Sequence, residues 1–119
     1  FIFVDDVLYD KDRTRIIFCP TEKTGDFVIT EGVESVDGYA FCGCEALESI
    51  SFPEGVEYIG KRAFGDCKRL ESAELPMSVA FIGQDAFEGC ESLVAVMVPE
   101  LTEFEGNYAF PENTEVIYY

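Results

Sequence analysis

Five cysteines are the side chains of this sequence best suited to metal or redox chemistry. Three of them recur at intervals of 23 residues, at Cys44, Cys67 and Cys90. A column of thiols at equivalent places in a repeat could bind a metal ion or exchange electrons. The sequence has no histidine and no Cys-x-x-Cys pair, so the usual companions of such sites are missing. We therefore predict that the three thiols are buried, unbonded side chains that act as small apolar groups.

The two other cysteines, Cys19 and Cys42, lie outside this column. Because five is an odd number, at least one thiol is either unpaired or bonded to another chain. Two interpretations of the outlying pair remain open. An oxidising compartment would permit a Cys19–Cys42 disulfide, and a reducing one would leave both thiols free.

Carboxylates are the second group that could carry chemistry, since the chain has 24 acidic residues and eight basic ones. Oxygen ligands for a hard cation are offered by a cluster near the start, Asp5, Asp6, Asp10 and Asp12. The cluster lacks the glycine and terminal glutamate of a calcium-binding EF-hand loop, so it predicts a solvated turn. No two carboxylates stand out as an acid and base pair. We predict that the chain is not an enzyme and that it holds no metal or cofactor.

The net charge of −16 limits the kinds of partner. All basic residues lie in segments 11–23 and 61–69, and ten acidic residues but no basic one follow Arg69. Such a surface repels phosphate backbones, so nucleic acid is not an expected partner. No apolar run reaches the roughly 18–20 residues of a membrane span, so no membrane insertion is expected within this segment. Because the chain opens at Phe1, we expect it to be a piece of a longer protein.

The spacing of the cysteines belongs to a repeat of 23 residues. An Ala-Phe pair occurs at 40–41, 63–64, 86–87 and 109–110, and a proline at 53, 76 and 99. A unit of this size cannot bury its apolar side chains by itself. The repeat therefore predicts stacked coils that share one continuous core.

Within each unit, the apolar spacing changes from that of a strand to that of a helical turn. Ile50 and Phe52 alternate with serines, as in a strand with one buried face. Ala63, Phe64 and Cys67 have the three-residue spacing of a short helical turn. The repeat predicts parallel strands near 27–29, 49–52, 72–75 and 95–98. Ahead of the repeats, two apolar runs that flank a polar turn predict a β-hairpin of 7–10 and 15–19.

The recurring pattern I-G-x-x-A-F-x-x-C-x-x-L-x-x-I-x-L-P resembles the BspA-type (Treponema-type) leucine-rich repeat over residues 28–119. The hairpin resembles the family's "DGVLYDKD" opening, with Asp6 in place of the glycine. The resemblance implies an α/β solenoid, in which a right-handed superhelix carries a parallel β-sheet on one face and short helical turns opposite. It also implies an N-terminal β-hairpin cap.

We expect residues 1–119 to form one leucine-rich-repeat domain. Its parts are an N-terminal hairpin or cap at 1–26, repeats at 27–101 and a divergent last repeat or C-terminal cap at 102–119. The last unit departs from the pattern with Thr102, Glu105 and Asn113 in place of valine, isoleucine and cysteine. These departures predict either irregular stacking near the C-terminus or a cap.

Proteins that share this repeat are typically bacterial, located on the cell surface or secreted, and implicated in adhesion. The resemblance thus implies a non-enzymatic module that binds a protein or glycan on a host or neighbouring cell. A structural spacer within a longer surface protein is the alternative. The sequence leaves the ligand and the oligomeric state open.

Two surfaces are candidates for binding. The first is formed by outward strand positions, Ser49, Ser51, Ser72, Glu74, Ala95 and Met97. Solenoids commonly bind through concave sheets, and small residues leave room for a partner, although they would equally suit an idle solvated surface. The second is an aromatic stripe at one repeat position, Tyr58, Phe81 and Phe104. If outward, it would form an apolar interface, but burial in the core or partial burial is the expectation.

Overall fold

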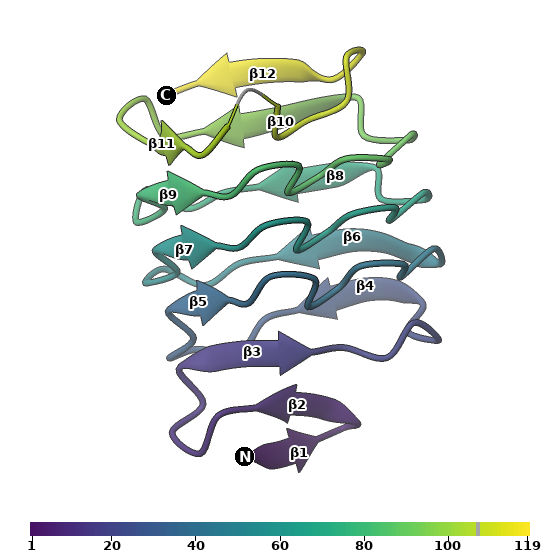
Figure 1. Cartoon of the computed structure of the whole chain (residues 1–119), viewed down its shortest axis with the longest axis vertical. Helices are drawn as coiled ribbons and strands as arrows, with labels where there is room; N and C mark the ends of the chain where they lie inside the picture. Colours follow the sequence, from purple (N-terminus) through teal and green to yellow (C-terminus); the bar gives the residue numbers. More distant parts are fainter. Residues whose placement is uncertain (107) are drawn as a thin grey trace.

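The computed structural model describes residues 1–106 and 108–119, and in them the chain winds into a solenoid of stacked coils (Figure 1). A seven-stranded sheet and a five-stranded sheet run along the stack and enclose one core. The strands in these residues are β1 (Ile2–Val4), β2 (Val7–Tyr9), β3 (Arg15–Phe18), β4 (Gly25–Val28), β5 (Ser35–Val36), β6 (Leu47–Ser51), β7 (Tyr58–Ile59), β8 (Ser72–Glu74), β9 (Phe81–Ile82), β10 (Ala95–Val98), β11 (Glu103–Phe104) and β12 (Glu115–Tyr118).

The five-stranded sheet has the order β12-β10-β8-β6-β4, and each neighbouring pair in it is parallel. Its strands confirm the ladder predicted near 27–29, 49–52, 72–75 and 95–98, and β12 extends it. Burial alternates along β8, where Ser72 and Glu74 are exposed and Ala73 is buried. Because the strands pair in register, this alternation repeats from coil to coil and gives the sheet one core face and one outer face.

The seven-stranded sheet has the order β1-β2-β3-β5-β7-β9-β11. Its first three strands are antiparallel, which confirms the predicted hairpin of 7–10 and 15–19 and adds β1 to it. From β3 onward the pairs are parallel. The sequence predicted a parallel sheet on one face only. The second parallel sheet was missed because strands of two residues are too short to show an alternating pattern.

The segments that lead from the seven-stranded to the five-stranded sheet consist of turns, which stack on the equivalent turns of the neighbouring coils through backbone hydrogen bonds. The predicted short helical turns are wrong, since residues 1–106 and 108–119 contain no helix. The amide of Ala63 donates to Gly60 O within its own turn (3.1 Å), but that of Phe64 donates to Ala86 O in the next coil (2.8 Å). A helix would direct both amides to carbonyls four residues earlier. Hydrogen bonds between coils therefore replace those that a helix would form.

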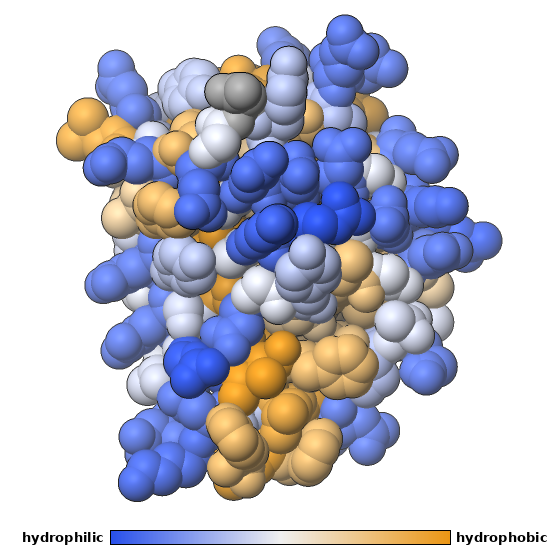
Figure 2. Space-filling view, in the orientation of Figure 1, coloured by the Kyte–Doolittle hydropathy of each residue, from blue (hydrophilic) through white to orange (hydrophobic). Residues whose placement is uncertain are grey.

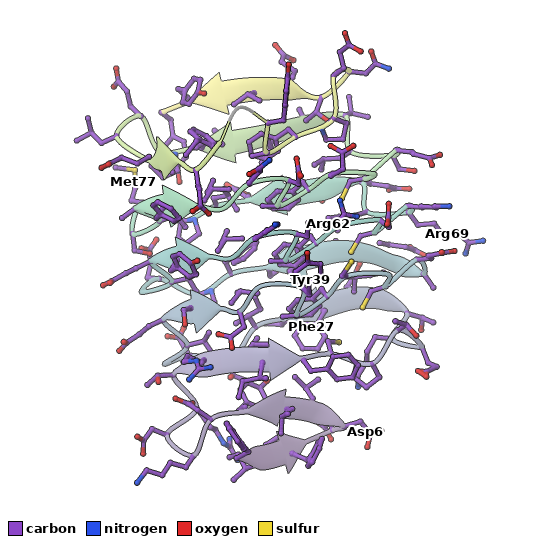
Figure 3. All side chains as sticks on the ribbon, in the orientation of Figure 1. Asp6, Phe27, Tyr39, Arg62, Arg69 and Met77 are labelled. Atoms are coloured by element: carbon purple, nitrogen blue, oxygen red, sulfur yellow. The ribbon has the colours of Figure 1, made fainter. Side chains whose placement is uncertain are left out.

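Left-handed backbone conformations recur at two positions of these turns and prevent a helix from forming. One position holds Gly43, Asp66 and Gly89, and the other holds Tyr39, Arg62 and Asp85. The φ angles are 63° at Tyr39, 49° at Arg62 and 57° at Asp85. Each step is 23 residues, and Figure 3 shows Tyr39 and Arg62 one above the other on the ribbon. A positive φ in a residue with a side chain is costly, so the hydrogen bonds between coils must offset this strain at each step.

Phenylalanine side chains at one repeat position form the centre of the core. The rings of Phe41, Phe64, Phe87 and Phe110 stack in series, with centroids 4.9, 5.0 and 5.2 Å apart. The backbones of neighbouring coils approach closely at the repeated glycine, where a Cβ on Gly60 would lie 2.4 Å from Gly38 N and one on Gly83 would lie 2.5 Å from Lys61 N. The Ala-Phe pair and the glycine before it are thus explained by packing.

The cysteine column is buried, as predicted. Cys44, Cys67 and Cys90 are fully buried and form no disulfide. The Cys67 thiol donates to Phe41 O at 3.2 Å and the Cys90 thiol to Phe64 O at 3.0 Å, each in the preceding coil. The neighbouring Cys90 thiol and burial both raise the pKa of the Cys67 thiol. Complete burial and the absence of a disulfide show that the column acts in packing.

Cys19 extends this column, although its spacing to Cys44 is not 23 residues. It is fully buried, its thiol is free, and the Cys44 thiol lies 3.8 Å from its carbonyl oxygen. The Cys19–Cys42 disulfide is not formed, and Cys42 is half-buried with a free thiol. Of the two interpretations left open by the sequence, the structure agrees with the one in which both thiols are free.

The last coil stacks in both sheets, with local changes of register. In β12, Glu115 pairs with Ala95, a step of 20 residues, whereas Ala95 pairs with Ser72, a step of 23. In β11, Phe104 pairs with Ile82. Thr102, which replaces a valine, is buried and donates its hydroxyl to Val79 O at 2.8 Å. The irregularity predicted here includes these changes of register, and the strands of the last coil remain parallel to their neighbours.

Candidate binding face on the five-stranded sheet

The outward residues of the five-stranded sheet form two rows that cross all its strands. One row runs through Asp26, Ser49, Ser72, Ala95 and Glu115. The other runs through Val28, Ser51, Glu74, Met97 and Ile117. The six residues that the sequence singled out therefore lie side by side, from β6 to β10. Strand alternation and parallel register together produce this arrangement.

Between larger side chains, these small residues leave an open depression of about 580 Å³ on the outer face of the sheet. All six predicted residues line it, and Ile50 and Ala73, both buried, form part of its floor. Toward the C-terminal end, large apolar side chains remain in contact with solvent: Met97 is 37% exposed and Ile117 is 39% exposed. The depression thus combines a low centre with an apolar side.

Tyr119 forms the C-terminal end of the depression. Its backbone amide donates to Val98 O at 3.0 Å, which continues the β12 ladder, and its phenol donates to Leu75 O, two coils away. Burial and then the charges of Glu54 and Glu74 raise the pKa of the Tyr119 phenol. A phenol and two carboxylates from three different coils thus line the same depression.

Charge on this face is one-sided. Among the described residues that line the depression, Glu54 and Glu74 are acidic and none is basic. Beyond its edge, Asp26 accepts a hydrogen bond from the Ser49 hydroxyl at 2.7 Å. Sequence reasoning missed Glu54, Ile117 and Tyr119. Glu54 follows a strand rather than lying in it, and the other two reach the site only through the shortened last coil.

The three residues of the aromatic stripe do not lie together in the structure. Tyr58 and Phe81 stack, with centroids 5.3 Å apart, and Tyr58 is 40% exposed. Phe104 lies apart from this pair, because the register change in β11 turns it toward Phe110, at a centroid distance of 6.1 Å. Phe81 and Phe104 are half-buried. The structure thus brings two of the three predicted residues together.

The N-terminal meander β1–β3 carries an apolar patch that the sequence did not single out. Exposed phenylalanines gather on it, Phe1, Phe3 and Phe18. Figure 2 shows apolar side chains at this end of the molecule, below a mostly hydrophilic surface. On the inner side, Val7, Tyr9 and Ile16 are buried and close the end of the core. The meander therefore covers the end of the core with an outer surface that is itself partly apolar.

The early aspartates organise turns. Both oxygens of the Asp10 carboxylate accept hydrogen bonds from Thr14, its amide and its hydroxyl, each at 2.8 Å. Asp5 and Asp6 have positive φ in the turn between β1 and β2. Within 1–106 and 108–119, no group of three or more cysteine or acidic residues is placed to hold a metal ion. The same residues contain no helix long and apolar enough to cross a membrane.

Comparisons with known proteins agree with this architecture. The pattern of the BspA type leucine-rich repeat region matches residues 14–118 in six copies. No curated protein sequence matches the chain. A leucine-rich repeat protein from Eubacterium ventriosum has a similar structure, with a TM-score of 0.77 and 30% identity over 84% of this chain and 29% of that chain.

Two further solved structures are similar. The leucine-rich repeat protein of T. pallidum gives a TM-score of 0.71 and 26% identity over 94% of this chain and 60% of its own. A leucine-rich cell surface protein from Faecalibacterium prausnitzii gives a TM-score of 0.62 and 24% identity over 97% of this chain and 38% of its own. This last similarity is one of fold alone. The chain thus spans between 29% and 60% of the length of these relatives.

Proposed function

This chain belongs to the BspA-type leucine-rich repeat family, and we propose that it is a non-enzymatic interaction module that binds through its five-stranded sheet. One observation supports this choice of face. The six outward residues chosen from the sequence line a single open depression that spans neighbouring coils. Its volume and its mixture of apolar and polar side chains suit a segment of a partner rather than a deeply enclosed substrate.

We place this module on a bacterial cell surface or in a secreted protein, with a protein or glycan of a host or neighbouring cell as its partner. Family membership supports this proposal, because adhesion is the role generally associated with such repeats. A purely structural spacer would need no open binding face, and the experiment below separates the two roles.

Arginine substitutions in the centre of the depression test the proposal. Ser72→Arg together with Ala95→Arg adds bulk and charge at outward positions and leaves the core side chains unchanged. Host extracellular proteins are first captured on the unmodified chain, and the dissociation constant of a captured partner is then measured. We expect the double variant to bind it at least about tenfold more weakly, equivalent to about 1.4 kcal/mol.

A matched control has the same two substitutions on the other sheet, Ser35→Arg and Ala80→Arg. Ser35 begins β5 and Ala80 is an exposed residue just before β9. Melting temperatures of both variants establish that they fold. The proposal is wrong if the sheet variant binds as well as the unmodified chain, or if the control loses binding equally. Either result would mean that the partner does not bind specifically through the five-stranded sheet, whereas failure to capture any partner would favour the spacer role.

A further inference from the structure

The depression presents two carboxylates that no basic side chain of the described part of the chain neutralises. Ion pairs in that part join Arg15 to Asp37 (2.7 Å) and Arg62 to Asp66 (3.1 Å), and neither pair lines the depression. Glu54 and Glu74, which do line it, are exposed. Carboxylates without a partner, beside a surface that is also apolar, attract a ligand that carries a positive charge.

Apolar side chains beside these carboxylates define the rest of the ligand. Met97, Ile117 and Tyr119 remain between 37% and 40% exposed. Leu75 and Pro76 also line the depression and are buried. A lysine or arginine side chain has an apolar stem and a cationic end, which matches this combination. Tyrosine, in addition, offers a ring face on which a cation can rest.

The net negative charge of the chain argues against an acidic partner. With a net charge of −16 and no basic residue after Arg69, the coils that carry β10 and β12 repel phosphates, sulfates and acidic sugars. A neutral glycan would leave Glu54 and Glu74 without compensation. Charge complementarity therefore favours a basic polypeptide over a glycan.

The dimensions of the depression favour an extended segment. It spans four strands, β6 to β12, whose spacing of about 4.8 Å gives a length of roughly 14 Å. An extended chain covers this length with about four residues, at roughly 3.4 Å each. The low serines and alanine at the centre allow its backbone to approach the sheet.

We propose that the outer face of the five-stranded sheet binds an extended basic segment of a protein partner. A lysine or arginine of that segment pairs with Glu54 and Glu74, and a neighbouring apolar side chain covers Met97 and the Tyr119 ring. This inference rests on the proposed function, since it specifies the partner of the same face.

Two synthetic probes test the proposal in 150 mM NaCl. The first is a blocked hexapeptide of alternating leucine and lysine, and the second has glutamine in place of each lysine. The NaCl screens distant charges, because the Debye length is then about 8 Å. We expect calorimetric titration to give the lysine peptide a dissociation constant at least about tenfold lower than that of the glutamine peptide.

Matched charge variants locate the interaction. Glu54→Gln with Glu74→Gln should weaken binding of the lysine peptide by about tenfold. Glu57→Gln with Glu103→Gln makes the same change in net charge on the other sheet, just before β7 and in β11, and should weaken binding of the lysine peptide less than about twofold. The proposal is overturned if the two double variants weaken binding equally, if the glutamine peptide binds as tightly as the lysine peptide, or if the lysine peptide does not bind.

Failure of this inference can be distinguished from failure of the proposed function. If the lysine peptide does not bind, while Ser72→Arg with Ala95→Arg abolishes capture of a host protein, the face is correct and its basic partner is not. If the arginine variant retains capture of its partner, the face itself is wrong.

Discussion

The two sheets of this solenoid share one core and differ in what they present to solvent. In the five-stranded sheet, Ser72 and Ala95 leave a depression on the outer face. In the seven-stranded sheet, Tyr58 and Phe81 fill the equivalent space with stacked rings. Both sheets form by the same parallel stacking at the same spacing. The difference teaches that stacking sets the architecture, whereas the size of the outward side chains decides which face can accept a partner.

The strands themselves contribute to this contrast. β6 has five residues and β10 has four, so each presents two or more outward positions to one face. β7 and β9 have two residues each, which leaves one outward position per coil. A partner can therefore contact two adjacent rows on the five-stranded sheet and only one on the other sheet.

The largest expected effect would test whether the two sheets depend on a single core. Phe64 is fully buried and stacks on Phe41 and Phe87. Phe64→Ala should lower the free energy of unfolding by about 3–5 kcal/mol, because it leaves a cavity between coils. Hydrogen exchange should show loss of amide protection in β6 and β8 together with β7 and β9. Loss in one sheet alone would mean that the sheets are separate units.

A smaller effect would sharpen the contrast between the outer faces. Tyr58→Ala removes the stacked ring and should cost about 0.5–1.5 kcal/mol in unfolding free energy. Ser72→Ala, on the depression, should change it by less than about 0.5 kcal/mol, since the serine is exposed. Denaturant titration of both variants measures the two values. Equal losses would show that the depression contributes to stability as much as the aromatic pair does.

The smallest effect concerns the electrostatics of the depression. Burial, Glu54 and Glu74 raise the Tyr119 pKa above its ordinary value of 10.0. Glu54→Gln with Glu74→Gln should lower it part of the way back, and Glu57→Gln with Glu103→Gln should leave it unchanged. NMR titration of the tyrosine rings, assigned with a Tyr119→Phe variant, measures both. A fall of the same size in the control would mean that net charge, not proximity, raises the pKa.

The sign of this shift also predicts a dependence of stability on pH. A raised pKa means that the folded chain holds the phenol proton more tightly than the unfolded chain does. The resulting stabilisation is fully present below about pH 10 and is lost as the pH rises through the folded-state pKa. Tyr119→Phe should abolish this component, which denaturant titrations on either side of pH 10 would detect.

The sequence by itself determined the parts of this protein that recur. A period of 23 residues with Ala-Phe pairs, cysteines and prolines in register predicted stacked coils, four of the strands and the buried thiols. Period-two alternation predicted which side chains of those strands point outward, from Ser49 to Met97. These features follow from local patterns of burial, which every coil repeats.

Only the tertiary structure decided what depends on contacts between coils. The three-residue spacing of Ala63, Phe64 and Cys67 fits a helical turn and a non-helical turn equally well. Hydrogen bonds from backbone amides to carbonyls of the next coil favour the non-helical turn. Cys19 entered the thiol column without the 23-residue spacing, and Tyr119 reached the depression through a step of 20 residues. Such positions follow from the hydrogen bonds and packing of the neighbouring coil, which no local pattern in the sequence records.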